Sequence, residues 1–185
     1  MNIRNHKPIF LYVVFLLILS LTGCSKKSNN NIEFNFNSNN EYLGFKDLAF
    51  SSIKDAKESY FVVFENGYLT NGQESWNNFL AQSSTNIDTQ IRIYNVIAEK
   101  DYHEYIDIFY RDSLYYVFSS NDKINKSTGY KYLYDLNDAS LNDLKTFFIV
   151  ISNSSDITYT KVMNDQLSSI YINNKDYKIV VWGIR

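Results

Sequence analysis

Short apolar runs separated by polar loops fill most of the second half of the chain. In 90–98, Ile91, Ile93 and Ile97 alternate with polar or amphipathic residues. This period of two places the isoleucines on one face of a strand. Similar alternation, or a compact apolar run, predicts further strands at 60–64, 105–111, 114–119, 130–136, 147–151, 168–172 and 177–182. The run at 147–151 is apolar on both faces, which is typical of a central buried strand.

One segment has helical periodicity instead. Within 73–82, Trp76, Phe79 and Leu80 recur at spacings of three and four residues, which places them on one face of a helix. These side chains should enter the core. The stretch 44–59 is ambiguous, although its apolar residues can line a short helix.

Turn residues mark several boundaries. Asn66-Gly67 follows the first strand, and Asp112-Ser113 separates two strands by the spacing of a tight hairpin. Asn71 or Gly72 stands where the helix needs an N-cap. Consecutive strands joined by short polar loops favour antiparallel pairing. The pattern therefore predicts an α+β fold: a largely antiparallel sheet of five to seven strands, with the 73–82 helix packed on one face.

The amino terminus has a different character. Arg4 and Lys7 precede an apolar run over 9–19, which small and polar residues follow. A positive start, a short apolar run and small residues before a cut are typical of a secretory signal peptide, here 1–23. The run is shorter than the roughly 20 residues that a spanning helix needs. The alternative interpretation is an uncleaved membrane anchor.

The end of this segment reads Leu21-Thr22-Gly23-Cys24 and resembles the bacterial lipobox. The resemblance implies that a diacylglyceryl group joins the Cys24 sulfur and that a peptidase cuts between Gly23 and Cys24. Cys24 is the chain's one cysteine, so it has no intramolecular disulfide partner. Two acyl chains give a stable anchor. We therefore expect a bacterial lipoprotein on the extracytoplasmic face of the cell membrane.

The residues after the cysteine divide into two parts. Residues 24–40 are rich in Asn and Ser, which favour turns and cannot form a core, and this composition predicts a flexible tether. Phe34 and Phe36 offer an alternative, the start of an edge strand. Residues 41–185 then form a single globular domain of the usual size.

Charge excludes one class of partner. The chain has 18 basic and 20 acidic residues, and removal of residues 1–23 deletes two basic ones, which leaves a net charge of −4. A weakly acidic chain without a basic patch is not typical of nucleic-acid binding.

The middle of the chain resembles a known group. A Trp-bearing helix, an Ile-Arg-Ile strand and a tyrosine-rich hairpin follow one another within 60–182. This order resembles small Bacillus-type lipoproteins that carry domain of unknown function 4362. The resemblance implies an envelope location and no particular activity.

Groups suited to catalysis are few. After removal of 1–23 the chain keeps one histidine, His103, and Cys24, so no Cys-His pair and no cysteine-containing zinc site is expected. No Gly-x-Ser-x-Gly turn and no Gly-rich phosphate loop occurs. Glu99, Asp101 and Glu104 with His103 could hold a metal ion, as could Asp135, Asp138 and Asp143, but solvated loops are the alternative for both clusters. We predict no catalytic residue, metal or cofactor.

Aromatic residues suggest binding instead. Tyr130, Tyr132 and Tyr134 fall on one face of a predicted strand, and other aromatics lie on neighbouring strands: Tyr105, Phe109, Tyr115 and Tyr116. Exposed tyrosines suit contact with protein or carbohydrate, whereas ordinary sheet packing is the alternative. The sequence favours a non-catalytic module that binds a protein, peptide or wall component. An accessory or protective envelope lipoprotein and an envelope hydrolase are the alternatives.

The anchor can be tested directly. Replacement of Cys24 by alanine removes the thiol that accepts lipid, so Cys24→Ala should leave unprocessed, unlipidated precursor. Mass spectrometry of the native protein should find a lipid-modified Cys24 at its amino terminus. An unmodified Cys24, or cleavage at another bond, contradicts the prediction.

Overall fold

The described part of the chain contains eight strands, which form two sheets, together with helices. The computed structural model describes residues 32–46, 48, 52–59, 61–97, 102–123, 126–137, 146–167 and 176–184. The first sheet has the strand order β2-β1-β3-β4-β5, and the second has β6-β7-β8. The strands are β1 (Val62–Glu65), β2 (Tyr68–Asn71), β3 (Thr89–Ile97), β4 (Tyr102–Arg111), β5 (Leu114–Ser119), β6 (Tyr132–Asn137), β7 (Thr146–Ser152) and β8 (Tyr177–Ile184). The helices are α2 (Ile53–Glu58), α3 (Gln73–Ser84) and α4 (Tyr159–Leu167).

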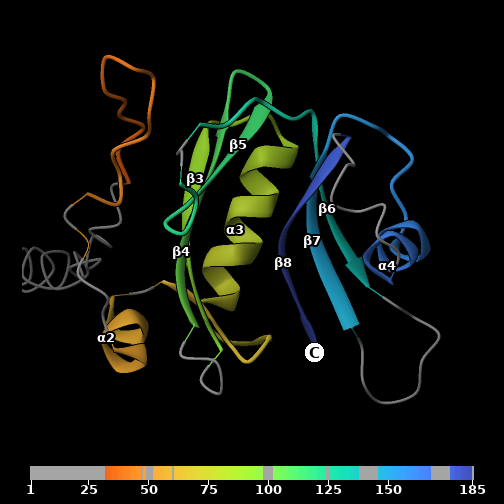
Figure 1. Cartoon of the computed structure of the whole chain (residues 1–185), viewed down its shortest axis with the longest axis horizontal. Helices are drawn as coiled ribbons and strands as arrows, with labels where there is room; N and C mark the ends of the chain where they lie inside the picture. Colours follow the sequence, from red (N-terminus) through yellow and green to blue (C-terminus); the bar gives the residue numbers. More distant parts are fainter. Residues whose placement is uncertain are drawn as a thin grey trace, which may run out of the picture.

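The elements form successive layers (Figure 1). The five-stranded sheet and the three-stranded sheet face each other, α2 lies outside the first, and α4 lies outside the second. All strand neighbours are antiparallel except β1 and β3, which are parallel. The predicted α+β class and the largely antiparallel pairing are confirmed, with the strands divided between two sheets.

Both predicted tight turns join neighbouring antiparallel strands. Asn66 and Gly67 have φ values of 51° and 82°, and Asp112 and Ser113 have values of 49° and 62°. Two positive φ values in a row are the mark of a type I′ turn, whose twist matches that of the flanking strands. Asp-Ser therefore adopts the turn that Asn-Gly favours.

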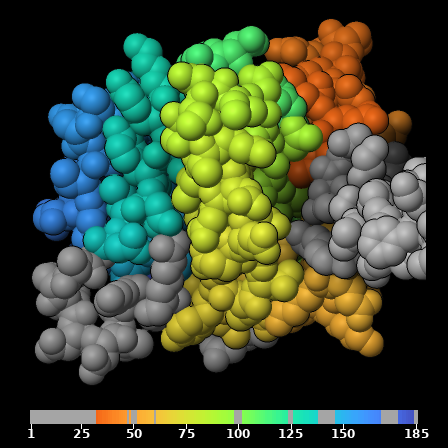
Figure 2. All heavy atoms as spheres, turned by 180° about the vertical axis from the view of Figure 1, so that it is seen from behind, coloured from red at the N-terminus to blue at the C-terminus, as the bar shows by residue number. Residues whose placement is uncertain are grey.

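Helix α3 closes one side of the space between the sheets, with one face buried and the other exposed. Trp76 and Phe79 are buried with their rings stacked at 5.7 Å, Leu80 packs beside them, and Asn77 and Asn78 are exposed. The predicted core face is therefore confirmed. The same core contains Phe64 and Ile93 from the first sheet and Phe147 and Ile149 from the second. Seen from behind, α3 crosses the molecule between the two sheets (Figure 2).

The N-cap of α3 requires glycine. Gly72 caps the helix with φ at 81°, and a Cβ there would lie 2.8 Å from the Phe61 carbonyl oxygen and the Val62 Cα. Both the left-handed backbone and the close approach exclude a larger residue. Asn71 instead donates from its side-chain amide to the Phe61 carbonyl at 3.0 Å.

The amino-terminal part of the described chain corrects one expectation. Residues 24–40 were predicted to be a tether, but 32–40 lie on the outer face of the first sheet. Ile32 is buried, and the Phe34 ring lies 4.7 Å from that of Phe109. Phe36 forms an isolated antiparallel bridge with Tyr42, so the edge-strand alternative comes nearer to the structure. The apolar side chains of Ile32, Phe34 and Phe36 are spaced two residues apart, and their packing fixes this segment in spite of the Asn-rich composition around them.

The other predicted strands and helices are confirmed only in part. The strands predicted between 60 and 151 are present with shifted ends, and 147–151 is the central strand of its sheet. Strand β2 and helix α4 were missed, and α2 settles part of the ambiguous 44–59 stretch. The strand predicted at 168–172 lies outside the described residues, as do Gly23 and Cys24.

The two sheets meet at both margins. On one side Tyr115 and Tyr130 exchange two main-chain hydrogen bonds of 2.8 and 2.9 Å, which links β5 to the chain entering β6. On the other side Gly183 of β8 lies against the β1–β2 turn, where a Cβ would come 1.8 Å from the Gly67 carbonyl oxygen. A side chain at position 183 would force β8 away from the β1–β2 turn.

Truncation of the central tryptophan should test the core. The Trp76 Nε1–H has no hydrogen-bond partner in the described structure, so the ring contributes by packing. Trp76→Ala should cost about 3–5 kcal/mol of unfolding free energy, a large share of the roughly 5–15 kcal/mol typical of a domain. Chemical denaturation measures this loss. Exposed Asn78→Ala is the control and should be nearly neutral; equal effects of the two variants contradict the assignment.

Candidate functional site

The inner face of β3 and β4 changes character along its length. Ile93 lies opposite Ile106 in the core, but the next pair on this face is Asn95 opposite Glu104. Helix α3 covers the isoleucine end only: it starts at Gly72 against Val62, which pairs with Ile93. Its other end meets the start of β3, where the Thr89 hydroxyl donates to Gln82 at 2.6 Å. The polar pair therefore lies beyond the helix.

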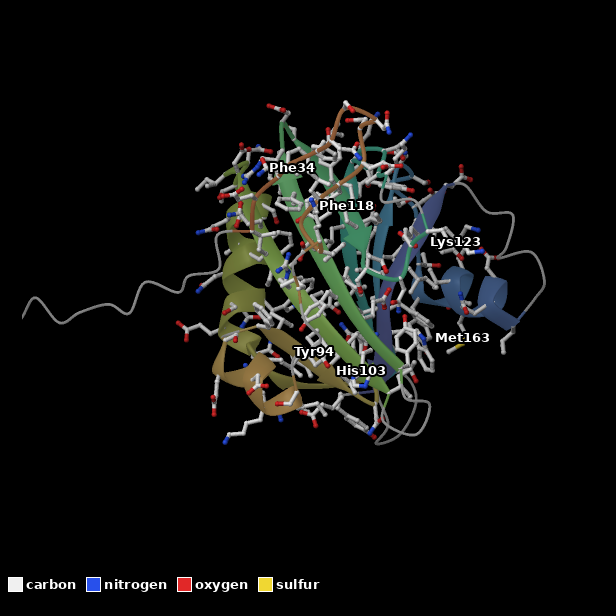
Figure 3. The ribbon with its side chains drawn as sticks, turned by 60° about the vertical axis from the view of Figure 1, so that its left-hand side comes forward. Phe34, Tyr94, His103, Phe118, Lys123 and Met163 are labelled. Carbon is white, nitrogen blue, oxygen red and sulfur yellow. The ribbon has the colours of Figure 1, made fainter. Side chains whose placement is uncertain are left out.

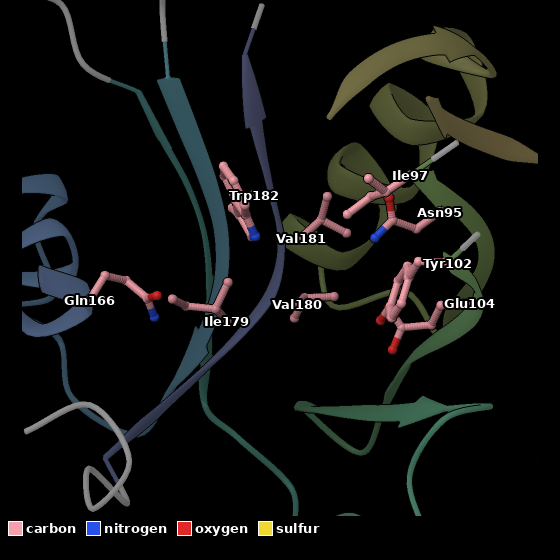
Figure 4. Close-up of a pocket in the computed structure, with 9 residues that line it drawn as sticks. All are labelled: Asn95, Ile97, Tyr102, Glu104, Gln166, Ile179, Val180, Val181 and Trp182. Atoms are coloured by element: carbon pink, nitrogen blue, oxygen red, sulfur yellow. The ribbon is translucent and has the colours of Figure 1, made fainter. Parts of the chain in front are cut away.

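A hollow of about 320 Å³ lies at this polar end, and we call it the β8 groove. That volume is at the lower end of the roughly 300–1,000 Å³ typical of ligand pockets. One side comes from β3 and β4, and the other comes from α4 and β8 (Figure 4). The lining residues are Asn95, Ile97, Tyr102, Glu104, Gln166, Ile179, Val180, Val181 and Trp182.

Glu104 is the one carboxylate among these lining residues. It accepts hydrogen bonds from the Tyr102 hydroxyl at 2.7 Å and from the Ser119 hydroxyl. Burial and the hydrogen bond to Glu104 raise the pKa of Tyr102 to about 12, so its hydroxyl stays protonated and donates at neutral pH. The carboxylate is thus held in place by two neutral donors.

Trp182 supplies an exposed aromatic ring at the rim. The residue is 59% exposed, although tryptophan is usually well buried. It lies on β8 opposite Phe148 of β7, and its neighbour Gly183 is fixed against Gly67. An exposed indole on a backbone held at both sides is a ready contact for a ligand.

The two described residues of the candidate metal cluster at 99–104 do not converge. His103 and Glu104 are adjacent on β4, so their side chains project to opposite faces of the sheet. The His103 Nδ1 lies 2.9 Å from the Tyr94 hydroxyl on the outer face (Figure 3), whereas Glu104 lines the groove. These two residues cannot share an ion. Glu99 and Asp101 lie outside the described residues.

The three predicted surface tyrosines are not brought together. The Tyr130 ring packs against the core between the sheets, whereas Tyr134 packs on the outer cluster beside α4. Tyr132 and Tyr134 share that outer face with their ring centres 6.0 Å apart, and Tyr132 is exposed. A binding role for these tyrosines stays a prediction.

The other aromatics of the predicted surface pack into the structure. Tyr105, Phe109 and Tyr115 are buried, and Tyr116 packs against the amino-terminal segment. Figure 3 shows Phe34 from that segment beside Phe118 of β5, with 6.2 Å between the ring centres. Sheet packing, the alternative stated above, describes these residues.

A buried charged network lies on the outer face of the first sheet. The Arg92 guanidinium donates to both carboxylate oxygens of Asp107 at 2.6 and 2.5 Å and to the Gly44 carbonyl at 3.1 Å. The Tyr42 hydroxyl donates to Asp107 at 2.6 Å. We call Arg92, Asp107 and Tyr42 the latch, because they join segment 32–46 to the sheet.

Aromatic rings surround the latch. The guanidinium carbon of Arg92 lies 5.6 Å from the centre of Phe45 and 6.0 Å from that of Tyr105. Burial raises the pKa of Tyr42 well above its usual range, and the neighbouring Asp107 carboxylate adds to the effect. A second hollow of about 330 Å³ borders Arg92, but this guanidinium is already bound to Asp107 and Gly44. The latch is therefore a structural element, and the β8 groove is the candidate site.

Comparisons with known proteins give no guide to this site. No protein-family model matches the chain, and no curated protein or solved structure matches it either. Among the described residues, none of the helices is both long and apolar enough to cross a membrane.

Sequence reasoning missed most of the groove. It considered Glu104 only as a metal ligand and gave Trp182 no role. One usable signal was present: Asn95 interrupts the isoleucine face of a strand at the position where the core would continue. The other side of the groove was hidden, because a bulge in β8 shifts its pairing with β7 between Ile149 and Val150.

The latch can be broken in two ways. Tyr42→Phe removes one hydrogen bond to a buried carboxylate, at a cost of about 1.5–3 kcal/mol. Arg92→Ala leaves Asp107 buried without its cation, at a cost of about 3–5 kcal/mol. Both variants should speed amide hydrogen exchange in segment 32–46. Tyr116→Phe, in the same aromatic cluster, is the matched control and should change neither the free energy of unfolding nor the hydrogen exchange of segment 32–46. Unchanged exchange in Tyr42→Phe would show that the latch does not hold the segment.

Proposed function

We propose that this protein is a membrane-anchored extracytoplasmic lipoprotein whose domain is a non-catalytic binding module. The anchor is the lipid on Cys24, and the ligand is a protein, peptide or wall component. The β8 groove is the contact site. The observation that carries this proposal is the exposed indole of Trp182 at the rim of a hollow that also contains Glu104 and Asn95.

The chemistry of the groove supports binding over catalysis. Its described lining offers one carboxylate, two amide side chains, a protonated tyrosine and apolar groups. Glycoside hydrolysis uses two carboxylates, and acyl transfer uses a nucleophile activated by a base. The described lining supplies hydrogen bonds and ring contacts, which select and hold a ligand.

The location of the groove supports this proposal as well. Its walls are strands held by the core on one side and by the Gly183–Gly67 contact on the other. A rigid scaffold limits the entropy that side chains lose on binding. Trp182 can therefore act as an anchor residue whose contact is formed without rearrangement of the sheet.

Tryptophan fluorescence provides the test. The chain has two tryptophans, of which Trp76 is buried and Trp182 exposed, so acrylamide quenching of the detergent-solubilised full chain reports on Trp182. Muropeptides, wall polysaccharide and short peptides are titrated in turn. A true ligand should protect Trp182 from the quencher, and Trp182→Ala should weaken its binding by roughly tenfold or more.

Two controls identify the surface. Tyr132→Ala removes an exposed tyrosine on the same outer face of the second sheet but at its other end, opposite Ser152 rather than Phe148, and should leave binding unchanged. Loss of binding in Tyr132→Ala with normal binding in Trp182→Ala would move the site to the end of the sheet that carries Tyr132. If no compound in any of the three classes protects Trp182, the groove is not the binding site.

A further inference from the structure

The β8 groove follows the edge of a strand. Four consecutive residues of β8 line it, from Ile179 to Trp182. Successive side chains of a strand point to opposite faces, so a hollow that touches four in a row lies along the strand's edge. In the described structure β8 has a strand neighbour on one side only, which is β7. The hollow lies along its other side, so the main-chain groups of this described edge that face the hollow can meet a partner there.

Contacts at both ends limit the open edge to a short window. Gly183 is covered by the Gly67 main chain, and Lys178 forms an ion pair of 3.1 Å with Asp122. Residues 179–182 lie between these contacts. The bulge at this point interrupts regular pairing within the window. Only a few main-chain hydrogen bonds can form there, so side-chain contacts must provide much of the affinity.

The two sides of the window differ in chemistry. Trp182 and Ile179 offer an apolar outer side, with Gln166 beside them (Figure 4). Tyr102 and Glu104 form the inner side. An extended peptide beside β8 would direct alternate side chains to these two sides.

The charge of Glu104 indicates which kind of ligand side chain would bind on the inner side. No lysine or arginine of the described chain forms an ion pair with Glu104. Its two hydrogen-bond donors are the neutral hydroxyls of Tyr102 and Ser119. Asp122 also lies near Tyr102, but its charge is paired with Lys178, which leaves Glu104 as the carboxylate of the groove. A carboxylate beside an aromatic ring favours an ammonium or guanidinium group.

We propose that the ligand is a protein segment in extended conformation that pairs with the 179–182 edge of β8 and places a lysine or arginine side chain against Glu104. This inference rests on the proposed binding function and names the ligand for the same groove. The residues flanking the basic one contact Trp182 on the outer side.

Defined peptides test the proposal. A capped Thr-Val-Lys-Val-Thr peptide is titrated against the detergent-solubilised full chain, with calorimetry and protection of Trp182 from acrylamide as readouts. Peptides with glutamate or norleucine in place of the lysine test the charge. A peptide with alternate amides N-methylated tests the main-chain pairing. These comparisons use the unaltered protein, so they do not depend on the folding of any variant.

The lysine peptide should bind, and each of the other peptides should bind roughly tenfold or more weakly. Glu104→Gln should reduce affinity for the lysine peptide to a similar extent, while Glu41→Gln, a carboxylate change on the amino-terminal segment, should have no effect. Equal binding of the glutamate peptide overturns the charge assignment. Equal binding of the N-methylated peptide overturns strand pairing.

Failure of this inference can be separated from failure of the proposed function. If no peptide binds but a muropeptide or wall polysaccharide protects Trp182, the groove is a binding site and the peptide assignment is wrong. If nothing protects Trp182, both proposals are wrong.

Discussion

Burial of Trp76 and Phe79 between the sheets is the interaction on which the other layers depend. Each sheet is apolar on both faces, and each inner face needs a partner. Helix α3 supplies it on one side, and direct contacts such as Phe64 with Phe147, at 5.7 Å between ring centres, supply it elsewhere. The outer faces are covered separately, by segment 32–46 and α2 on the first sheet and by α4 on the second. The helix and these direct contacts together give the two sheets a common core.

The same helix explains why a groove exists. Helix α3 runs from Gly72, at the level of Ile93, to Gln82 at the start of β3. Beyond Ile93 the inner face of the first sheet has no helix above it. A polar pair, Asn95 and Glu104, follows at that level. The groove is thus the place where the sheets extend past the helix that closes one side of the space between them.

Sequence pattern predicted the elements with a strong period and missed those that depend on tertiary contacts. The α3 face and the β3 alternation were read correctly because burial imposes their spacing. Strand β2 was missed because its four residues carry too short a pattern. Segment 32–46 was assigned in part to a tether because composition does not reveal Tyr42 bonding to Asp107, 65 positions away. The groove depends on the β8 bulge and on the approach of Gly183 to Gly67, which no local pattern encodes.

The latch also bears on the proposed anchor. Segment 32–46 is fixed to the sheet by the hydrogen bonds from Tyr42 to Asp107 and from Arg92 to the Gly44 carbonyl, so at most the eight residues 24–31 would separate a lipid on Cys24 from the domain. Eight residues span roughly 29 Å when fully extended. A lipid-anchored domain would therefore stay within a few nanometres of the bilayer, with less reach than a tether ending at residue 40 would allow. A partner of the β8 groove must then be presented close to the membrane, as a segment of a membrane protein or of the adjacent envelope would be.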